Sequence, residues 1–306
     1  MIRTPLVSII FSCLMLVKAF GDDANTSSSV AAPGVVNVGD FGSDAPVERA
    51  ELPTRGVIAI AVEEGDKAFA AKEHWEEYNF QFKAKRWGKY SVRLSYSLKS
   101  SSLAVHLKFG ENNFKKQLSG TDGATKSARL GTAYIGNAGD QTLTLFTPNG
   151  VAWENFILSE IALVPAPEGE EIKQSRDGTV QLWAKDATTW SQNMRYEPKP
   201  EKNCLGFWTE LQDFAEWEFK MEKPGKYQVA LHQGSNPGGS EVVVQFGEQQ
   251  LKFTVPSTGD FHKHQPVSVG QIMVDKQGTY RLAIKPQTKS GKAIMDVEKV
   301  VLSPVD

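Results

Sequence analysis

The chain has 306 residues, 40% of them hydrophobic, which is enough to bury two hydrophobic cores. Its 34 basic and 36 acidic residues nearly balance, so no basic surface of the size needed for nucleic-acid binding is expected. The composition therefore indicates a globular protein of two domains, whose partners must be inferred from local sites.

Residues 1–21 have the pattern of a secretory signal peptide. Arg3 supplies the positive charge, and Leu6–Val17 form an apolar core that is shorter than the roughly 20 residues of a membrane-spanning helix. Cleavage near Ala19 or Gly21 would release a secreted or periplasmic chain. No later window is apolar enough to span a membrane.

Two polar segments divide the rest of the chain. Residues 22–53 are rich in Asp, Ser, Ala, Gly and Pro, and they predict a disordered linker because they offer few large apolar side chains. Residues 167–176 form a second polar stretch, predicted to be the linker between domains at 54–166 and 177–306.

The two domains repeat one sequence pattern. At a constant offset of 137 positions, residues 80–118 align with residues 217–255, and 12 of the 39 pairs are identical, including a Gly-Lys-Tyr and a Phe-Gly-Glu segment. After a slip of two residues the offset becomes 139 and continues to Pro165 and Pro304, near the end of each domain. The sequence therefore predicts two copies of one module.

Apolar residues alternate within each copy. Tyr227, Val229 and Leu231 are an example of the period of two that strands show when one face packs on a core. Turn sequences such as residues 223–226, Lys-Pro-Gly-Lys, separate these runs. The pattern predicts an all-β protein of two tandem antiparallel β-sandwich domains of jelly-roll type.

The sequence offers few catalytic or metal-binding motifs. Phosphate-binding glycine loops, Gly-x-Ser-x-Gly, His-Glu-x-x-His and Cys-x-x-Cys are absent from it, so a non-enzyme is predicted, although a glycosidase or lyase built on an unmarked pair of acids remains an alternative. A metal site formed by His232, His262 and His264 is another alternative to ordinary loop histidines. Cys204, the single cysteine after signal cleavage, is predicted to be an inert thiol without a disulfide partner.

Aromatic residues outside the alternating strands are the strongest binding candidates in the second domain. Trp208 follows a segment that contains Lys202 and Asn203, and Tyr196 lies close to two prolines. An aromatic face flanked by amide and cationic donors suits the C–H face and the hydroxyl groups of a sugar ring. The alternative is that these aromatic side chains close the end of the sandwich as packing.

Specific motifs follow one another along residues 177–305. They are Asp177-Gly178-Thr179-Val180-Gln181-Leu182, Ala184-Lys185-Asp186-Ala187, Met194-Arg195-Tyr196-Glu197-Pro198, Lys202-Asn203-Cys204-Leu205-Gly206-Phe207-Trp208-Thr209, Thr258-Gly259-Asp260-Phe261-His262 and Ala293-Ile294-Met295-Asp296. With these motifs the domain resembles the β-sandwich module that follows the catalytic domain in many secreted sulfatases of planctomycete-type bacteria, and more distantly galactose-binding-like carbohydrate-binding modules.

The resemblance implies both a ligand and an ion. The ligand would be a polysaccharide, and the family's association with sulfatases adds sulfated polysaccharides to the candidates. A structural calcium ion would join the first and last strands, with Asp186 and Asp296 at the matching acidic positions. The side chains expected to contact the polysaccharide are Arg195, Tyr196, Lys202, Asn203, Trp208, Phe261 and His262.

The first domain departs from this pattern. It lacks the segment that carries the Arg-Tyr-Glu-Pro and Lys-Asn motifs, and Ile157 occupies the position of Asp296, so ligand binding is assigned to the second domain. The predicted function is that of a secreted, non-catalytic carbohydrate-binding protein. The alternatives are a structural or interaction protein of the cell envelope, or an accessory subunit that docks onto a separate secreted sulfatase or glycosidase.

Overall fold

The computed structural model describes residues 52–62, 75–148, 150 and 155–305, so the predicted signal peptide and almost all of the linker 22–53 lie outside the described residues. In these ranges the regular elements are antiparallel β-strands and one short 3₁₀ helix, η1 (Ala184–Asp186). None of the described segments is a helix that could cross a membrane. The all-β antiparallel prediction is confirmed.

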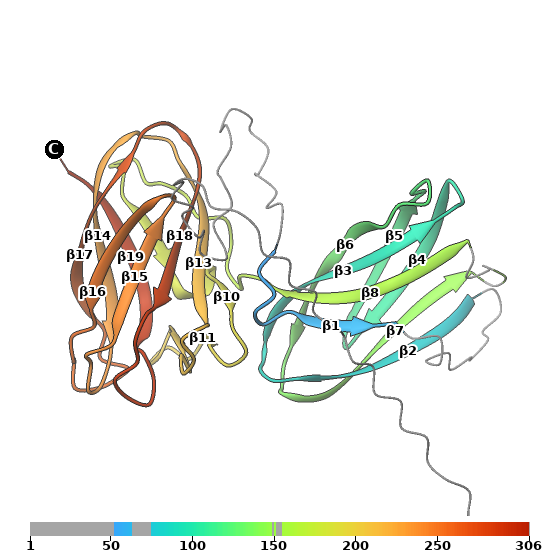
Figure 1. Ribbon diagram of the computed structural model, residues 1–306, viewed down its shortest axis with the longest axis horizontal. Coiled ribbons are helices and arrows are strands. Elements are labelled where there is room, and N and C mark those ends of the chain that lie inside the picture. The colour runs from blue at the N-terminus through green and yellow to red at the C-terminus, as the bar shows by residue number, and fades with distance from the viewer. Residues whose placement is uncertain (1–51, 63–74, 149, 151–154, 306) are drawn as a thin grey trace, which may run out of the picture. The chain divides into compact units, whose positions relative to one another are not determined.

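The first sandwich consists of two four-stranded sheets, with strand orders β1-β8-β3-β6 and β2-β7-β4-β5 (Figure 1). Its buried apolar side chains form one core between the sheets. The strands are β1 (Ile58–Ala61), β2 (Trp75–Ala84), β3 (Gly88–Leu98), β4 (Ser102–Phe109), β5 (Asn112–Ser119), β6 (Lys126–Ile135), β7 (Gly139–Pro148) and β8 (Phe156–Pro165).

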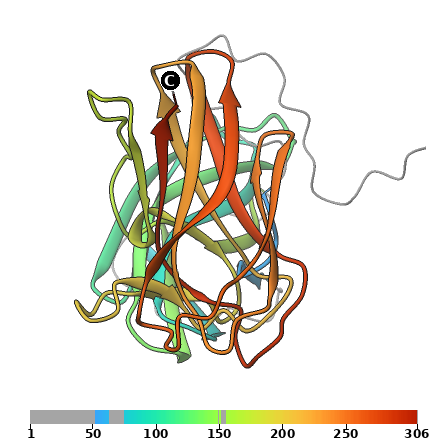
Figure 2. The same cartoon turned by 90° about the vertical axis from the view of Figure 1, so that its left-hand side faces the viewer.

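The second sandwich has the sheet orders β10-β13-β18-β15-β16 and β11-β12-β19-β14-β17, and β9 also pairs with β19. Figure 2 shows its paired strands, coloured orange to red, running side by side. The strands are β9 (Val180–Trp183), β10 (Thr188–Trp190), β11 (Arg195–Glu197), β12 (Cys204–Gly206), β13 (Phe214–Met221), β14 (Gly225–Gly234), β15 (Glu241–Phe246), β16 (Gln249–Thr254), β17 (Gln265–Val274), β18 (Gly278–Pro286) and β19 (Asp296–Pro304).

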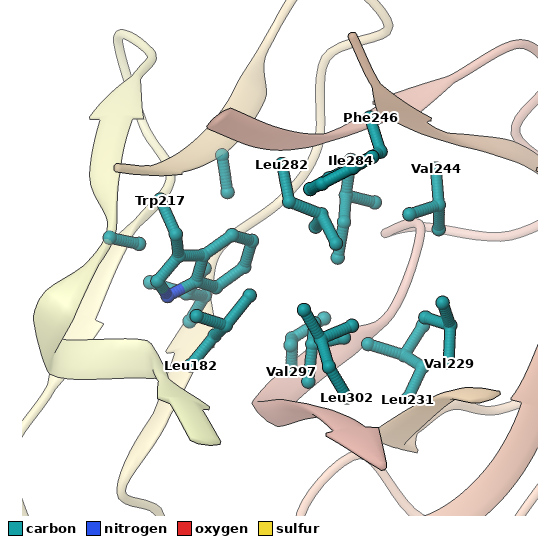
Figure 3. Close-up of a cluster of buried hydrophobic side chains, with 14 of the residues drawn as sticks. Leu182, Trp217, Val229, Leu231, Val244, Phe246, Leu282, Ile284, Val297 and Leu302 are labelled. Atoms are coloured by element: carbon teal, nitrogen blue, oxygen red, sulfur yellow. The ribbon is translucent and has the colours of Figure 1, made fainter. Parts of the chain in front are cut away.

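The predicted alternation places the core of the second sandwich correctly. Val229 and Leu231 of β14 lie opposite Leu282 and Ile284 of β18, and all four side chains are fully buried (Figure 3). Side chains at every second position point to one face of a strand, so each strand adds one row of apolar groups to this layer.

Backbone irregularities repeat between the two sandwiches as the sequence does. The pairing of β3 with β6 shifts between Val92 and Arg93, and that of β14 with β17 shifts between Val229 and Ala230, which is the same place at the offset of 137. In both copies a second shift, in the pairing with the last strand, follows three residues later. Bulges are usually kept among proteins of one family, so bulges at equivalent positions support the prediction of two copies of one module.

Residues 167–176 are predicted to be a linker, but several of them are bound to the second sandwich. Ile172 is buried in its core. Oε1 of Gln174 accepts hydrogen bonds from the backbone N–H groups of Glu222 and Lys223, at 2.8 and 3.1 Å. The second sandwich therefore begins before residue 177, because its core includes Ile172.

A short hairpin distinguishes the second sandwich. Strands β11 and β12 pair with each other, and Leu205 of β12 pairs with Val297 near the start of β19. The hairpin therefore adds two short strands to the sheet beside the beginning of β19. In the described part of the first sandwich no hairpin corresponds to it. The segment with the Arg-Tyr-Glu-Pro and Lys-Asn motifs thus forms an added sheet edge.

Candidate functional site

A cluster of polar side chains lies where this hairpin meets β19. Leu205 and Val297 both point into the core, and neighbouring residues of a strand point to opposite faces. Cys204 and Asp296 therefore point to the outer face of the sheet. Glu197 pairs directly with Cys204 across the hairpin, so its side chain lies on the same face.

Five residues make up this cluster, named here the Glu197–Asp296 cluster: Glu197, Lys202, Cys204, His262 and Asp296. Glu197, His262 and Asp296 each place a ligand atom within 4.8 Å of the others. Nε2 of His262 lies 3.9 Å from Oδ2 of Asp296, and the Cys204 thiol donates to the same oxygen at 3.6 Å. Nζ of Lys202 donates to Oε1 of Glu197 at 2.6 Å.

Both carboxyl groups of the cluster are buried. Only 5% of Asp296 and 7% of Glu197 is exposed. Burial raises the pKa of Asp296 to about 7, and the nearby negative charge of Glu197 adds to this effect. The hydrogen bond with Glu197 raises the pKa of Lys202, and burial raises the pKa of the Cys204 thiol. A fully buried thiol with a raised pKa is a poor nucleophile, in line with the prediction of an inert cysteine.

Two glycines make room for the cluster. A Cβ atom at Gly206 would overlap Oε2 of Glu197, and one at Gly234 would overlap the carbonyl oxygen of Phe261. Gly234 pairs with Asp296, so the absence of a side chain there lets residues 257–264 lie directly on the strand that holds the carboxylate. These glycines permit the close approach of three chain segments.

The loop of residues 257–264 is fixed by its own hydrogen bonds. Oγ1 of Thr258 accepts the backbone N–H of Ser235 at 3.0 Å, and Oδ1 of Asp260 accepts the backbone N–H of His262 at 2.7 Å. Thr121 holds the backbone N–H of Leu98 in the same way in the first sandwich, at 2.9 Å. The threonine anchor thus belongs to both copies, and in the second copy it positions His262.

Replacing Gly234 with alanine is expected to displace residues 260–262 and to lower the free energy of unfolding by about 1–3 kcal/mol, because the new methyl group has no space. Chemical denaturation measures this change. The matched control is Gly136→Ala in the first sandwich, where a Cβ atom meets no atom within 4 Å. Equal stability of the two variants would show that the loop does not lie on Gly234.

Four of the residues predicted to bind the ligand lie at or beside the cluster. Lys202 and His262 belong to it, and Phe261 precedes His262 in the same loop and is partly exposed. Asn203 follows Lys202 and accepts a hydrogen bond from the hydroxyl of Tyr196 at 2.8 Å. The Tyr196 side chain packs against the core, which leaves its ring unsuited to stacking on a sugar.

Arg195 is engaged within the protein. Its guanidinium carbon lies 3.5 Å from the centroid of the Phe207 ring, and its Nη1 donates to the carbonyl oxygen of Asn193 at 3.0 Å. Burial lowers its pKa. These contacts hold the arginine as a packing element of the hairpin.

The prediction that Trp208 stacks on a sugar is wrong. Its side chain is fully buried in the core, and its Nε1 donates to the carbonyl oxygen of Asp213 at 3.1 Å. The neighbouring ring of Phe207 is the exposed one, with 42% of the residue accessible. Of the two readings of this tryptophan, packing at the end of the sandwich is the correct one.

The acidic residues predicted to bind calcium have different surroundings. Asp186 accepts hydrogen bonds from the backbones of Glu170 and Trp183, whereas Asp296 is grouped with Glu197 and His262. Calcium takes six to eight oxygen ligands, while the cluster offers two carboxylates, an imidazole and a thiol. The residues around Asp296 therefore do not fit the calcium site that was expected.

The three histidines of the alternative metal site have different neighbours in the structure. His262 joins the two buried acids, whereas Nδ1 of His232 lies 3.6 Å from Oε2 of Glu298. Burial lowers the pKa of His232 and of His264. Glu197 and Cys204 complete the cluster in place of these two histidines, and no sequence signal indicates this role beyond the motifs in which they stand.

Comparisons with known proteins match one family model and several solved structures. Residues 186–306 match the family model described as domain of unknown function (DUF5077). None of the curated proteins compared with the chain matches it.

Among solved structures, the chain is similar to a GH26-CBM35 β-(1,4)-mannanase of Podospora anserina, with 15% identity and a TM-score of 0.34 over 43% of this chain and 28% of that one. It is also similar to a Paenibacillus xanthan lyase, with 16% identity and a TM-score of 0.34 over 83% of this chain and 25% of that one. A third is the C-terminal CBM6 of LamC from Zobellia galactanivorans, with 16% identity and a TM-score of 0.33 over 41% of this chain and 98% of that one. The chain thus spans about a quarter of each of the first two proteins.

Proposed function

We propose that the protein is a secreted, non-catalytic carbohydrate-binding protein, and that its second sandwich binds a polysaccharide at the exposed side of the Glu197–Asp296 cluster. One observation carries this proposal. Lys202 and His262, 60 positions apart in the sequence, come from two different loops to two neighbouring buried carboxyl groups: Lys202 donates to Glu197 at 2.6 Å, and His262 lies 3.9 Å from Asp296. The secretory pattern of residues 1–21 supports an extracellular or periplasmic location.

The chemistry of the cluster matches that of a sugar. Carboxylate oxygens accept hydrogen bonds from hydroxyl groups, and the Lys202 ammonium, the His262 imidazole and the Asn203 amide can donate to ring and hydroxyl oxygens. The side chains of Lys202 and His262 are 26% and 44% exposed, so a ligand can reach them. The partly exposed ring of Phe261 offers an apolar surface for the C–H face of a sugar.

The charge of the cluster bears on the class of polysaccharide. The carboxylate of Glu197 is compensated by Lys202, which leaves Asp296 as a second acid below the surface. The carboxyl oxygens of Glu197 and Asp296 favour hydroxyl-rich sugars because they can accept hydrogen bonds from hydroxyl groups, whereas Lys202 is the group that would meet a sulfate ester. We therefore place neutral polysaccharides first and sulfated polysaccharides second.

The first sandwich is proposed to be a scaffold. Ile157 pairs with Ser97 there as Asp296 pairs with Gly234 in the second sandwich, so the two positions are structurally equivalent. Ile157 is apolar and 50% exposed, and it offers no hydrogen bond to a sugar. The first sandwich thus has an aliphatic side chain at the position where the second sandwich has the buried carboxyl group of Asp296.

Affinity electrophoresis of the full secreted chain tests this proposal. We expect slower migration in gels that contain at least one neutral or sulfated polysaccharide. Phe261→Ala and His262→Ala are each expected to weaken binding about tenfold, which corresponds to about 1.4 kcal/mol. Tyr134→Ala, which removes a 48% exposed ring from the first sandwich, is the matched control and is expected to bind normally. Normal migration in every gel would refute carbohydrate binding, and unchanged binding by both variants would refute this site.

A further inference from the structure

We propose that Glu197, Cys204, His262 and Asp296 form a binding site for a divalent metal ion of the zinc class, instead of the calcium site that the sequence resemblance implied. The proposal concerns an ion below the surface of the Glu197–Asp296 cluster. It does not depend on carbohydrate binding.

The spacing of the ligand atoms is the first argument. A tetrahedral zinc site has bonds of about 2.0 Å to nitrogen and oxygen and about 2.3 Å to sulfur, so its ligand atoms lie about 3.3–3.6 Å apart. The ligand atoms of Glu197, His262 and Asp296 lie within 4.8 Å of one another, with Nε2 of His262 3.9 Å from Oδ2 of Asp296, and Sγ of Cys204 lies beside this group, 3.6 Å from the same oxygen. The separation of 3.9 Å is too long for a hydrogen bond, and the four ligand atoms would have to draw together around an ion.

The types of donor atom are the second argument. One imidazole, one thiol and two carboxylates are a set that zinc accepts in four-coordinate sites. Calcium prefers an all-oxygen shell with more ligands, and a thiol and an imidazole would occupy two of its positions poorly. The ligand set therefore selects for a borderline-soft metal ion rather than for a hard one.

The balance of charge is the third argument. Glu197 and Asp296 are two buried acids at close range, and Lys202 compensates only one negative charge. A divalent ion would deprotonate the thiol of Cys204, as metals do with coordinating cysteines. The positive charges of the divalent ion and of Lys202 would then balance the negative charges of two carboxylates and one thiolate. The buried group would be neutral as a whole.

The origin of the ligands indicates what the ion would do. Glu197 and Cys204 lie on the hairpin β11-β12, Asp296 begins β19, and His262 lies in the loop of residues 257–264. Cys204 and Asp296 are 92 positions apart in the chain. Four protein ligands leave no open position, so the site would be structural and would fasten the added hairpin and the loop to the last strand.

Metal titration of the full, tag-free secreted chain, first treated with a chelator, tests this inference. Isothermal calorimetry is expected to show one zinc ion per chain, and zinc is expected to raise the thermal midpoint of the second sandwich, whereas calcium is expected to do neither. Cobalt in place of zinc is expected to give the intense absorption of a thiolate–metal bond. Calcium binding tighter than zinc binding, or no zinc binding at micromolar concentration, would overturn the proposal.

Variants assign the ligands. His262→Ala and Cys204→Ser are each expected to weaken zinc binding by at least about tenfold, and Cys204→Ser is expected to remove the cobalt–thiolate absorption. His262 is 44% exposed, so its variant tests the site without disturbing the core. The control is His106→Ala in the first sandwich, where His106 stacks on Trp75 with ring centroids 4.2 Å apart. Unchanged zinc affinity in both ligand variants would overturn the assignment. Zinc binding is measured without polysaccharide, so each proposal can fail alone.

Discussion

Replacing Trp208 with alanine is expected to lower the free energy of unfolding of the second sandwich by about 3–5 kcal/mol. The indole is fully buried, and its Nε1 donates to the carbonyl oxygen of Asp213 at 3.1 Å. Truncation would leave a large cavity and a buried carbonyl group without its donor, and both effects destabilise the folded state. Chemical denaturation followed by near-ultraviolet circular dichroism measures the change.

The adjacent residue provides the matched control. Phe207→Ala removes a ring that is 42% exposed, so we expect it to cost less than half as much as the Trp208 variant. If the two variants were equally stable, the indole would not be buried, and the original interpretation of Trp208 as a stacking residue would stand. Polysaccharide binding by the Trp208 variant must be measured at a temperature at which the variant is still folded.

The fold was predictable because its determinants are local. Each strand reveals its core face by apolar residues at alternate positions, as Val229 and Leu231 do, and this signal depends only on neighbouring residues. The internal repeat shows the same strand pattern a second time, which supports the strand prediction in both copies. The two bulges in each copy were not predictable, because an extra residue in one strand leaves no mark in the composition of the chain.

Part of the site was predictable, and part depended on register. Lys202 and His262 stand in polar motifs, so sequence reasoning found them. Glu197 and Cys204 were missed because their shared direction depends on the pairing of a hairpin of two three-residue strands. Asp296 was found as an acid, but its partners come from loops whose positions no pattern of apolar residues determines.

The error at Trp208 has a specific cause. Trp208 lies outside the alternating strands, so no pattern of apolar residues indicates which way its side chain points. Phe207 has a φ of 59°, which turns the chain just before the tryptophan. The backbone N–H of Ile294 then bonds to the carbonyl oxygen of Trp208 at 2.8 Å and holds the turned segment against the core. A sequence pattern contains no signal for a positive φ at a phenylalanine.

Replacing Asp296 with asparagine is expected to stabilise the metal-free protein at pH 8 and to change its stability little near pH 4. Burial raises the pKa of Asp296 from 3.8 to about 7, so the folded state holds a proton that the unfolded state has released between these values. The contribution of the protonated Asp296 to the free energy of unfolding is therefore fully present below pH 3.8 and is lost as the pH rises through 7. At about 1.4 kcal/mol per pH unit, the full loss amounts to about 4 kcal/mol.

Asparagine avoids this loss because it stays neutral and can still accept the Cys204 thiol at its amide oxygen. Chemical denaturation from pH 4 to pH 8 with a chelator present should give a stability that falls with pH for the natural chain and a flatter profile for Asp296→Asn. Asp140→Asn, at an exposed carboxylate of β7, is the matched control and should follow the natural chain. Parallel profiles for the natural chain and Asp296→Asn would mean that the carboxylate reaches water. In that case the buried negative charge that argues for a metal ion would not exist, and the spacing and type of the ligand atoms would have to support the site alone.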